Sequence, residues 1–387
     1  MKQRASSGGC TEDVLVLSYW NLNDPSFGGA RRIQALLDLL GSRVVLCQPA
    51  PPHPRLKTRA FRPDLGRRKI GINWGMFNFL VPTTAARVRR LLRSDRPALI
   101  VLTSIWAYLP LRRMPDLPPV VLDAHDVLGN AIAERFGENH LFTRWVRSWE
   151  KRVVRQVDHV FTCSDLDRTE FMNRYTIPAE RVTTVSNGVD MHLWGEAERR
   201  AKPIDSTVEK EVKDAVVLFF MGKLDYQPNR QALAFLADRL MPELEGTDKG
   251  RFKLLVCGGP APDVAPHPSM LFAGRVEDIV PYVCRADICL APIFTGSGTR
   301  LKILEYMAAG KPVVATPKGA EGISGVSGEH FELVEVDGFA DAIRRLAADP
   351  AGARSMGTAG RQLVAERYDW SAIRAGWERV LSELCAD

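Results

Sequence analysis

The chain of 387 residues is long enough for two domains of common size, each with its own hydrophobic core. Its composition is ordinary for a soluble globular protein. Because no run of about 18 apolar residues occurs and the N-terminus lacks an apolar signal core, we expect a cytoplasmic protein. The net charge is +6 at pH 7, with 28 Lys and Arg against 17 Asp and Glu in residues 1–188, but no recognised nucleic-acid module accompanies this charge, so we expect no nucleic-acid partner.

The first half of the chain alternates between apolar runs and helical patterns. Residues 1–12 are polar and are predicted to be disordered. A first parallel strand is predicted at 14–20, then a loop to Gly29, a helix through Leu40 and a second strand from Val44. The region 49–82, rich in Pro and Arg, is predicted to be an irregular, pocket-shaping loop. Later strands are expected at Leu99–Leu102, Pro119–Ala124 and His159–Thr162.

Two segments of this half read as basic amphipathic helices. They are Arg87–Arg93 and Arg144–Arg152, and the second carries Trp145 and Trp149, which suit a lipid interface. An anionic membrane surface is therefore one candidate partner, with the protein peripheral on the inner face of the cell membrane. The alternative is that the aromatic face of this helix packs inward.

Near residue 190 the pattern restarts, which predicts a second domain. Its strands are expected at Ala215–Phe220, Lys253–Cys257, Met270–Ala273, Asp287–Ala291 and Val313–Ala315. Strands that alternate with helices imply an α/β fold with doubly wound parallel sheets, whose ligand crevices lie at the carboxyl ends of the strands. We expect domains at 1–190 and 191–370, and a final helix at 371–387 that packs back toward the N-terminal domain.

The most informative segment, 295–316, reads as an anion-binding loop, a helix, a turn and a strand. Gly296 and Gly298 let the backbone point its amides at a ligand where the helix begins. Arg300 and Lys302 add positive charge to the first helical turn, where the helix dipole disfavours cations unless an anion is bound. The alternative is an ordinary loop in which Lys302 and Glu305 form an ion pair three residues apart.

This segment resembles the donor-binding motif of retaining glycosyltransferases of family 4, which have the GT-B fold. Four other segments agree, in the family's order: Gly28–Arg32, Val185–Asp190, Phe219–Leu224 and Tyr368–Ser371. The resemblance implies two Rossmann-like domains that face a central cleft. It also implies retaining transfer of a sugar from a nucleotide-diphosphate sugar to a glycan, lipid-linked or small-molecule acceptor. The Pro-Asn and Gly-Thr-Arg-x-Lys patterns are similar to a subset associated with exopolysaccharide and cell-surface glycan assembly.

The chain departs from the family at two positions. The family commonly has a glutamate eight residues before Glu305, where this chain has Ser297, so a loop amide or the serine hydroxyl would have to replace a sugar-contacting carboxylate. Lys223 and Asn229 stand where many members have arginine and lysine. One phosphate-binding cation is therefore absent, and Arg300 or Lys302 would compensate.

The resemblance assigns a role to each candidate residue. The donor-binding set is Gly28, Gly29, Gly222, Lys223, Arg275, Val276, Gly296, Ser297, Gly298, Thr299, Arg300, Lys302 and Glu305. Within it, Lys223 and Arg300 are also expected to act in catalysis by stabilising charge on the departing phosphate. Glu305 is expected to accept hydrogen bonds from the ribose, and the segment with Arg275 and Val276 to meet the base. The alternatives are a surface lysine at 223 and a structural turn at 274–276.

His125 is the third expected catalytic residue. It directly follows a predicted first-domain strand, and in similar enzymes a histidine here contacts the donor sugar or assists the reaction. The alternative is a histidine that stabilises the loop at the strand end. The leaving phosphate would take the acceptor proton, so no covalent nucleophile is assigned.

We expect no metal and no cofactor beyond the nucleotide-sugar co-substrate. Asp165 and Asp167 formally match an Asp-x-Asp metal motif, but Ser164 before them suits a helix N-cap and the aspartates suit the helix dipole. The seven cysteines, an odd number without Cys-x-x-Cys, argue against a disulfide framework or zinc ribbon. Two rival functions remain, namely a sugar-nucleotide epimerase of the same architecture and a catalytically silent nucleotide-sugar-binding protein.

Overall fold

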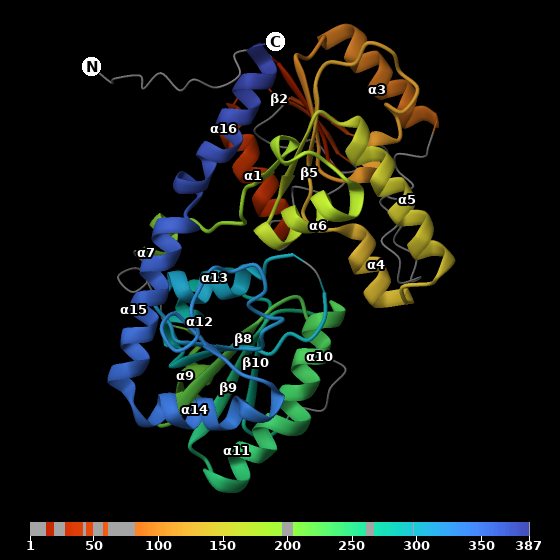
Figure 1. Ribbon diagram of the computed structural model, residues 1–387. Coiled ribbons are helices and arrows are strands. Elements are labelled where there is room, and N and C mark those ends of the chain that lie inside the picture. The colour runs from red at the N-terminus through yellow and green to blue at the C-terminus, as the bar shows by residue number, and fades with distance from the viewer. Residues whose placement is uncertain are drawn as a thin grey trace, which may run out of the picture. The chain divides into compact units, whose positions relative to one another are not determined.

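The computed structural model describes residues 13–18, 28–41, 44–48, 57–60, 82–195, 204–260, 267–296 and 298–386. The chain forms two compact units, one of residues 1–187 with 373–387 and the other of residues 188–372. Each unit has a parallel β-sheet with helices packed on it (Figure 1). The predicted α/β class with two parallel sheets is thus confirmed.

The sheet of the first unit has seven strands in the order β3-β2-β1-β4-β5-β6-β7, and every pairing is parallel. Its order reverses between β1 and β4, which is the place where sheets of this kind bind ligands. The strands are β1 (Val14–Leu17), β2 (Val44–Gln48), β3 (Lys57–Ala60), β4 (Leu99–Leu102), β5 (Val120–Asp123), β6 (His159–Thr162) and β7 (Val182–Thr184).

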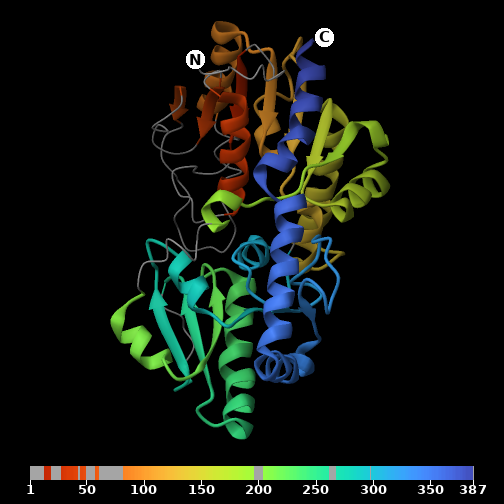
Figure 2. The ribbon, with the colours of Figure 1, turned by 90° about the vertical axis from the view of Figure 1, so that its left-hand side faces the viewer.

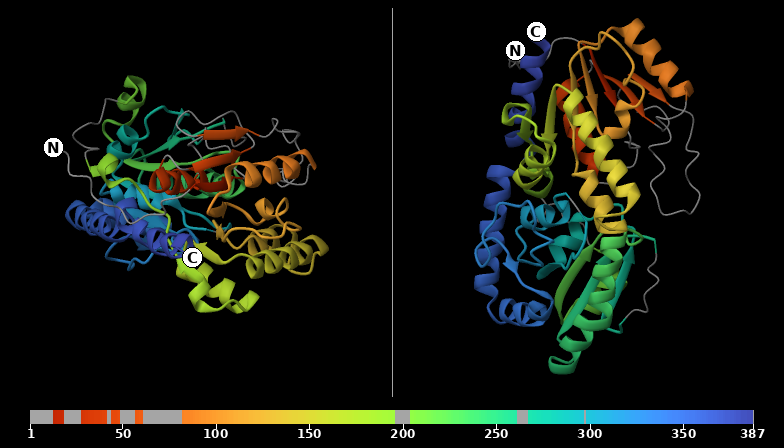
Figure 3. Two further views of the ribbon diagram at one scale, coloured as in Figure 1. Left: turned by 90° about the horizontal axis from the view of Figure 1, so that it is seen from above. Right: turned by 45° about the vertical axis from the view of Figure 1, so that its right-hand side comes forward.

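Helices cover this sheet, and the last of them comes from the far end of the chain. They are α1 (Gly28–Leu40), α3 (Pro82–Asp95), η2 (Ile105–Tyr108), α4 (Leu128–Phe136), α5 (Leu141–Gln156), α6 (Asp165–Tyr175), η3 (Ala179–Arg181) and α16 (Trp370–Ala386). α16 runs beside α1 (Figure 2), and its Trp377 is fully buried. α4 and α5 lie side by side (Figure 3).

The sheet of the second unit has six strands in the order β10-β9-β8-β11-β12-β13, also all parallel. They are β8 (Val216–Met221), β9 (Phe252–Cys257), β10 (Met270–Gly274), β11 (Ile288–Ala291), β12 (Val313–Ala315) and β13 (Glu332–Leu333). The central strands β8 and β11 are buried on both faces, as the continuous apolar runs predicted.

Two apolar clusters fill the space above and below this sheet. One includes side chains of α7, α12, α13 and α15, and the other includes side chains of α10, α11 and α14. The helices are α7 (Met191–Gly195), α9 (Ser206–Val212), α10 (Gln227–Phe235), the π-turn η4 (Leu236–Leu240), α11 (Met241–Thr247), α12 (Val280–Arg285), α13 (Leu301–Ala308), η5 (Val336–Gly338), α14 (Phe339–Ala348) and α15 (Pro350–Arg367).

Three features differ from the expectations. β3 lies within the region 49–82 that was predicted to be irregular, and the helix α1 begins at Gly28, two residues earlier than expected. Among the described cysteines, Cys163, Cys257 and Cys289 are buried free thiols, whereas Cys385 is disulfide-bonded. The odd number of cysteines argued against a disulfide framework, but it leaves room for a single disulfide. Within the described residues no helix is both long and apolar enough to cross a membrane.

Candidate functional site

The loop between β11 and α13 has the backbone geometry expected of an anion-binding loop. Gly296 and Gly298 have φ angles of +100° and +76°, which L-residues rarely adopt. α13 begins after Arg300, whose side chain makes no capping hydrogen bond to the helix. A helix start without a side-chain cap suits an anionic ligand, because its first amides and its dipole are directed at the loop. Ser297 lies outside the described residues.

Arg300 folds back over this loop. Its guanidinium donates to the carbonyl oxygens of Gly298, Gly296 (2.6 Å) and Thr295 (3.4 Å). These bonds hold the loop in its shape, so the structure places Arg300 as a support of the loop backbone. The role in phosphate stabilisation stays a prediction.

Lys302 lies between α13, α10 and the end of β8. Its Nζ donates to Asn229 Oδ1 at 2.8 Å and lies 4.2 Å from the centre of the Phe220 ring. Burial, followed by the charge of Arg300, lowers the pKa of Lys302 to about 7, and Glu305 opposes this shift. No ion pair among the described residues joins Lys302 to Glu305, so the ion pair of the alternative interpretation does not form, and Lys302 bonds Asn229 instead.

The backbone approaches closely at the end of β8. A Cβ added to Gly222 would lie 2.6 Å from Asn229 Nδ2 and 3.1 Å from Lys302 Nζ, so a larger residue would displace both side chains. Asn229 is itself fixed, since its Nδ2 donates to the Lys223 carbonyl at 2.9 Å. The Lys223 side chain is 60% exposed and lies 3.7 Å from Asp225, so this ion pair is a weak one.

The remaining candidates of this unit lie at two places. Glu305 is buried, 6% exposed, one helical turn after the start of α13. Arg275 and Val276 follow β10 and line a hollow of about 620 Å³ together with side chains of α9 and α12. Gly274 before them has a φ of +68°, which supports the alternative of a structural turn at this strand end. The base-contacting role stays a prediction.

In the first unit, His125 follows β5 and lies beside a buried ion pair. His125 Nε2 lies 3.3 Å from Asp123 Oδ2, which makes Asp123 its close neighbour, whereas the buried Nδ1 has no hydrogen-bond partner among the described residues. Arg32 of α1 donates to both Asp123 oxygens at 3.0 Å from Nε and to Oδ1 at 2.6 Å from Nη2. Asp123 is buried, which raises its pKa, but Arg32 and His125 hold that pKa well below its usual range.

Arg32 is a residue that the sequence reasoning missed. Its Nη1 donates to the carbonyl of Val185 at 2.5 Å and its guanidinium lies 5.0 Å from the centre of the Trp377 ring. Arg32 is 1% exposed, so its guanidinium contacts these protein groups and not solvent. The sequence pattern that could have identified Arg32 is its position on the apolar face of α1, four residues before the buried Leu36. Gly28 and Gly29 form the first turn of the same helix.

Glu150 of α5 holds the helix that follows the His125 loop. Its carboxylate accepts hydrogen bonds from the amides of Leu128 and Gly129, both at 2.9 Å, and from the hydroxyl of Tyr175. Because Glu150 is fully buried, its pKa is raised to about 7 despite these bonds.

Asp165 and Asp167 lie in the first turn of α6, as predicted. Ser164 is the N-cap and accepts a hydrogen bond from the Asp167 amide at 3.1 Å. Within the described part of the chain, no three His, Cys, Asp or Glu side chains come together as metal ligands would.

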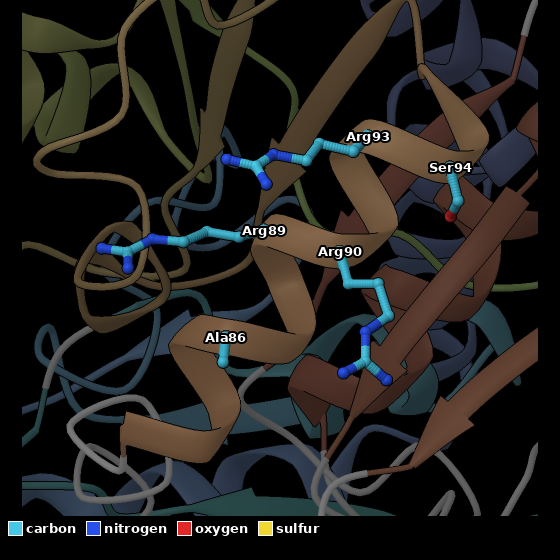
Figure 4. A pocket seen from close by; sticks show the side chains of 5 residues that line it. All are labelled: Ala86, Arg89, Arg90, Arg93 and Ser94. Carbon is cyan, nitrogen blue, oxygen red and sulfur yellow. The ribbon is translucent and has the colours of Figure 1, made fainter.

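The basic helices of the first unit differ in how their aromatic residues lie. Trp149 faces inward and donates from Nε1 to the Ile105 carbonyl at 3.2 Å, whereas Trp145 is 49% exposed and stacks on Trp106. The inward alternative is thus right for Trp149, whereas Trp145 has about half of its surface exposed and the rest packed against Trp106 and Phe142. On α3, Arg89 and Arg93 point to one side and Arg90 to another, around a hollow of about 540 Å³ (Figure 4).

Family models match both units. A model described as Glycosyltransferase Family 4 matches residues 28–193, and one described as Glycosyl transferases group 1 matches residues 215–349. The alpha-maltose-1-phosphate synthase of Mycolicibacterium smegmatis is 27% identical over 66% of this chain and 70% of its own length. The D-inositol 3-phosphate glycosyltransferase of Kribbella flavida is 28% identical over 54% of this chain and 53% of its own length.

Solved structures share the fold over nearly the whole chain. Sucrose-phosphate synthase from Thermosynechococcus elongatus has a TM-score of 0.76 and 19% identity, and the match covers 97% of this chain and 100% of that one. HepE of Anabaena, solved with UDP and glucose, has a TM-score of 0.68 and 16% identity, with 96% and 99% covered.

Proposed function

The chain belongs to glycosyltransferase family 4, and on that basis we propose a retaining transfer of a sugar from a nucleotide-diphosphate sugar to an acceptor. The observation that carries the proposal is the loop of Gly296 and Gly298, which meets a helix start beside the half-buried Lys302. Arg300, the N-cap residue of that helix, makes no side-chain capping bond. This arrangement suits a diphosphate, because amides, helix dipole and ammonium are concentrated in one place.

In the proposed mechanism the bond between the sugar C1 and the phosphate oxygen breaks while the acceptor oxygen bonds to C1 on the same face. The acceptor proton passes to the departing phosphate, and no covalent nucleophile is assigned. The amides of 296–299, Lys302 and Lys223 stabilise the charge that develops on the phosphate. Glu305 accepts from the ribose hydroxyls, and Arg275 and Val276 hold the base.

The roles of Arg300 and His125 follow from their contacts. Arg300 supports the loop whose amides face the phosphate, since it already bonds three loop carbonyls. His125 contacts the donor sugar, and its buried Nδ1, which has no hydrogen-bond partner within the described part of the chain, supports that role. Gly28 and Gly29 leave the start of α1 without side chains, so that a donor phosphate can approach its backbone.

We also propose that transfer needs no metal and no further cofactor, because cationic side chains and the helix start can neutralise the diphosphate. Activity is then expected to survive treatment with a chelator. Complete loss of activity, with recovery on addition of magnesium or manganese, would refute metal independence. Asp165 and Asp167 would then be the candidate metal ligands.

The experiment that tests the function joins a binding panel to a transfer assay. UDP-, GDP-, ADP- and dTDP-sugars are compared by thermal shift, because a ligand of the native state raises the melting temperature. UDP-glucose is the first choice, since HepE of Anabaena was solved with it. The stabilising donor is then incubated with glycan, lipid-linked and small-molecule acceptors. Transfer to an added acceptor supports the proposal; isomerised donor alone would indicate an epimerase, and binding without turnover a silent binding protein.

We also propose a place at the inner face of the cell membrane, where a lipid-linked acceptor would be within reach, and the surface of the first unit supports it. α3 exposes four arginines, and α5 exposes Leu141 (78%) and Trp145 (49%) beside Arg144, Lys151 and Arg152. An exposed tryptophan and leucine among cations suit an interface with anionic lipid.

Liposome flotation tests this membrane proposal. Binding should require acidic phospholipid, weaken with salt and fall in Trp145→Ser. Val326→Ser is the matched control, because Val326 is 57% exposed in the other unit. Equal failure on neutral and acidic liposomes would indicate an acceptor in solution.

A further inference from the structure

We propose that Lys302 binds the donor's diphosphate in a proton-coupled way, so that its amine takes up a proton from solvent as the diphosphate binds. This inference rests on the proposed function for the identity of the anion. It goes beyond it by making donor binding depend on the protonation of one side chain.

The first step is that the ammonium lacks a counter-ion. Of its three possible donor hydrogens, one is used by Asn229 Oδ1 at 2.8 Å, and the Phe220 ring lies 4.2 Å away. Among the described residues no carboxylate lies within ion-pair distance of Lys302 Nζ. Two hydrogens are therefore left for an anion, at the place where the loop amides also face.

The second step concerns the groups that surround the amine. From α10 it meets the neutral Asn229 and from β8 the Phe220 ring and Gly222. The charged groups that act on it are Arg300 in the loop, which disfavours the ammonium, and Glu305 in its own helix, which favours it. Burial is the largest effect and also disfavours the charged form.

The third step is the consequence for binding. With the pKa of free Lys302 lowered to about 7, the amine is about half neutral at pH 7 and about nine-tenths neutral at pH 8. A diphosphate supplies the missing negative charge and restores the ammonium. The proton comes from the buffer, and the number of protons taken up for each bound anion should rise toward one as the pH is raised above 7.

Inorganic pyrophosphate is the probe, because it carries the diphosphate without the base or the sugar. Its affinity is measured by calorimetry from pH 6 to pH 9, in two buffers of different ionisation enthalpy. Pyrophosphate titrates in this range itself, so the matched control is Lys302→Arg, whose guanidinium keeps its charge. Between pH 7 and pH 9 the wild type should lose at least about tenfold more affinity than this control.

Two further variants separate charge from packing. Lys302→Gln should lose at least tenfold in affinity at pH 7. The double variant Lys302→Gln with Asn229→Lys should regain most of it, because Asn229 contacts the Lys302 ammonium and a lysine at 229 can bring its own ammonium to that place. Melting temperatures show that each variant is folded.

Several results would overturn the inference. Equal affinity of the wild type and Lys302→Gln would do so, as would parallel pH profiles of the wild type and Lys302→Arg. No recovery in a double variant that melts like the wild type would assign the loss to packing. A protein that binds pyrophosphate with proton uptake but transfers no sugar would instead refute the proposed function and leave this inference standing.

Discussion

Replacing Arg32 with methionine would leave the carboxylate of Asp123 buried without its cation. Asp123 is 0% exposed and Arg32 1%, and three contacts between 2.6 and 3.0 Å join them. Removing one partner of such a buried pair costs about 3–5 kcal/mol, a large share of the roughly 5–15 kcal/mol that stabilises a typical domain. We therefore expect the free energy of unfolding in urea, followed by circular dichroism, to fall by about 3–5 kcal/mol.

The control removes both charges. Arg32→Met combined with Asp123→Leu eliminates the buried carboxylate and leaves only the Val185 carbonyl and its neighbours without their donor, a cost of about 1–3 kcal/mol. The double variant should therefore be more stable than the single one. If both variants are equally destabilised, or if the single change costs under about 1 kcal/mol, the electrostatic reasoning is refuted.

The pH dependence gives an independent check of the same pair. The pKa of Asp123 lies below its unfolded value, so the pair contributes stability above about pH 4 that is lost as the pH falls through the folded pKa. The difference in stability between the wild type and Arg32→Met should therefore shrink below about pH 4. Turnover should also fall in the single variant, because Asp123 is the neighbour that fixes His125.

Three further predictions concern single side chains. Glu305→Gln should weaken nucleotide binding by about 1.5–3 kcal/mol in calorimetry, and an unaltered affinity would disprove the ribose role. Because the pKa of Glu150 is raised to about 7, charging it disfavours the folded state, so stability should fall by about 3 kcal/mol between pH 4.5 and pH 7. Glu150→Gln should flatten that profile in pH-dependent urea unfolding, and a flat wild-type profile would contradict the assignment. Gly222→Ala should cost about 1–3 kcal/mol, since its Cβ would meet Asn229 at 2.6 Å, whereas Gly246→Ala, with nothing within 4 Å, should be neutral or stabilising in thermal unfolding.

The central strands were predictable because burial on both faces leaves a continuous apolar run. Such runs correctly predicted four central strands, namely β4, β5, β8 and β11. The edge strand β3 has one neighbour and the sequence Lys-Thr-Arg-Ala, which carries no such signal. β7 and β13, of three and two residues, are too short for any periodicity to show.

The candidate site was predictable as far as its chain segments but not as far as its contacts. Glycine spacing placed the loop at the start of α13, since that conformation is a local property. Lys302 bonds Asn229, which is 73 positions away, and not Glu305, its partner in the alternative interpretation of the sequence. The contact between Arg32 and Asp123, which are 91 positions apart, was not predictable either. Helical periodicity shows which face of a helix is buried, but it does not show which residues that face contacts.

The order of the two units along the chain has a consequence for biosynthesis. Residues 188–372 form one uninterrupted unit, whereas the other unit needs residues 373–387 as well as 1–187. During synthesis, the unit that begins second can therefore complete its fold first. Until Trp377 leaves the ribosome, the guanidinium of Arg32 lacks the indole that lies beside it in the finished protein. A nascent chain stalled before that point should expose this unfinished surface to chaperones.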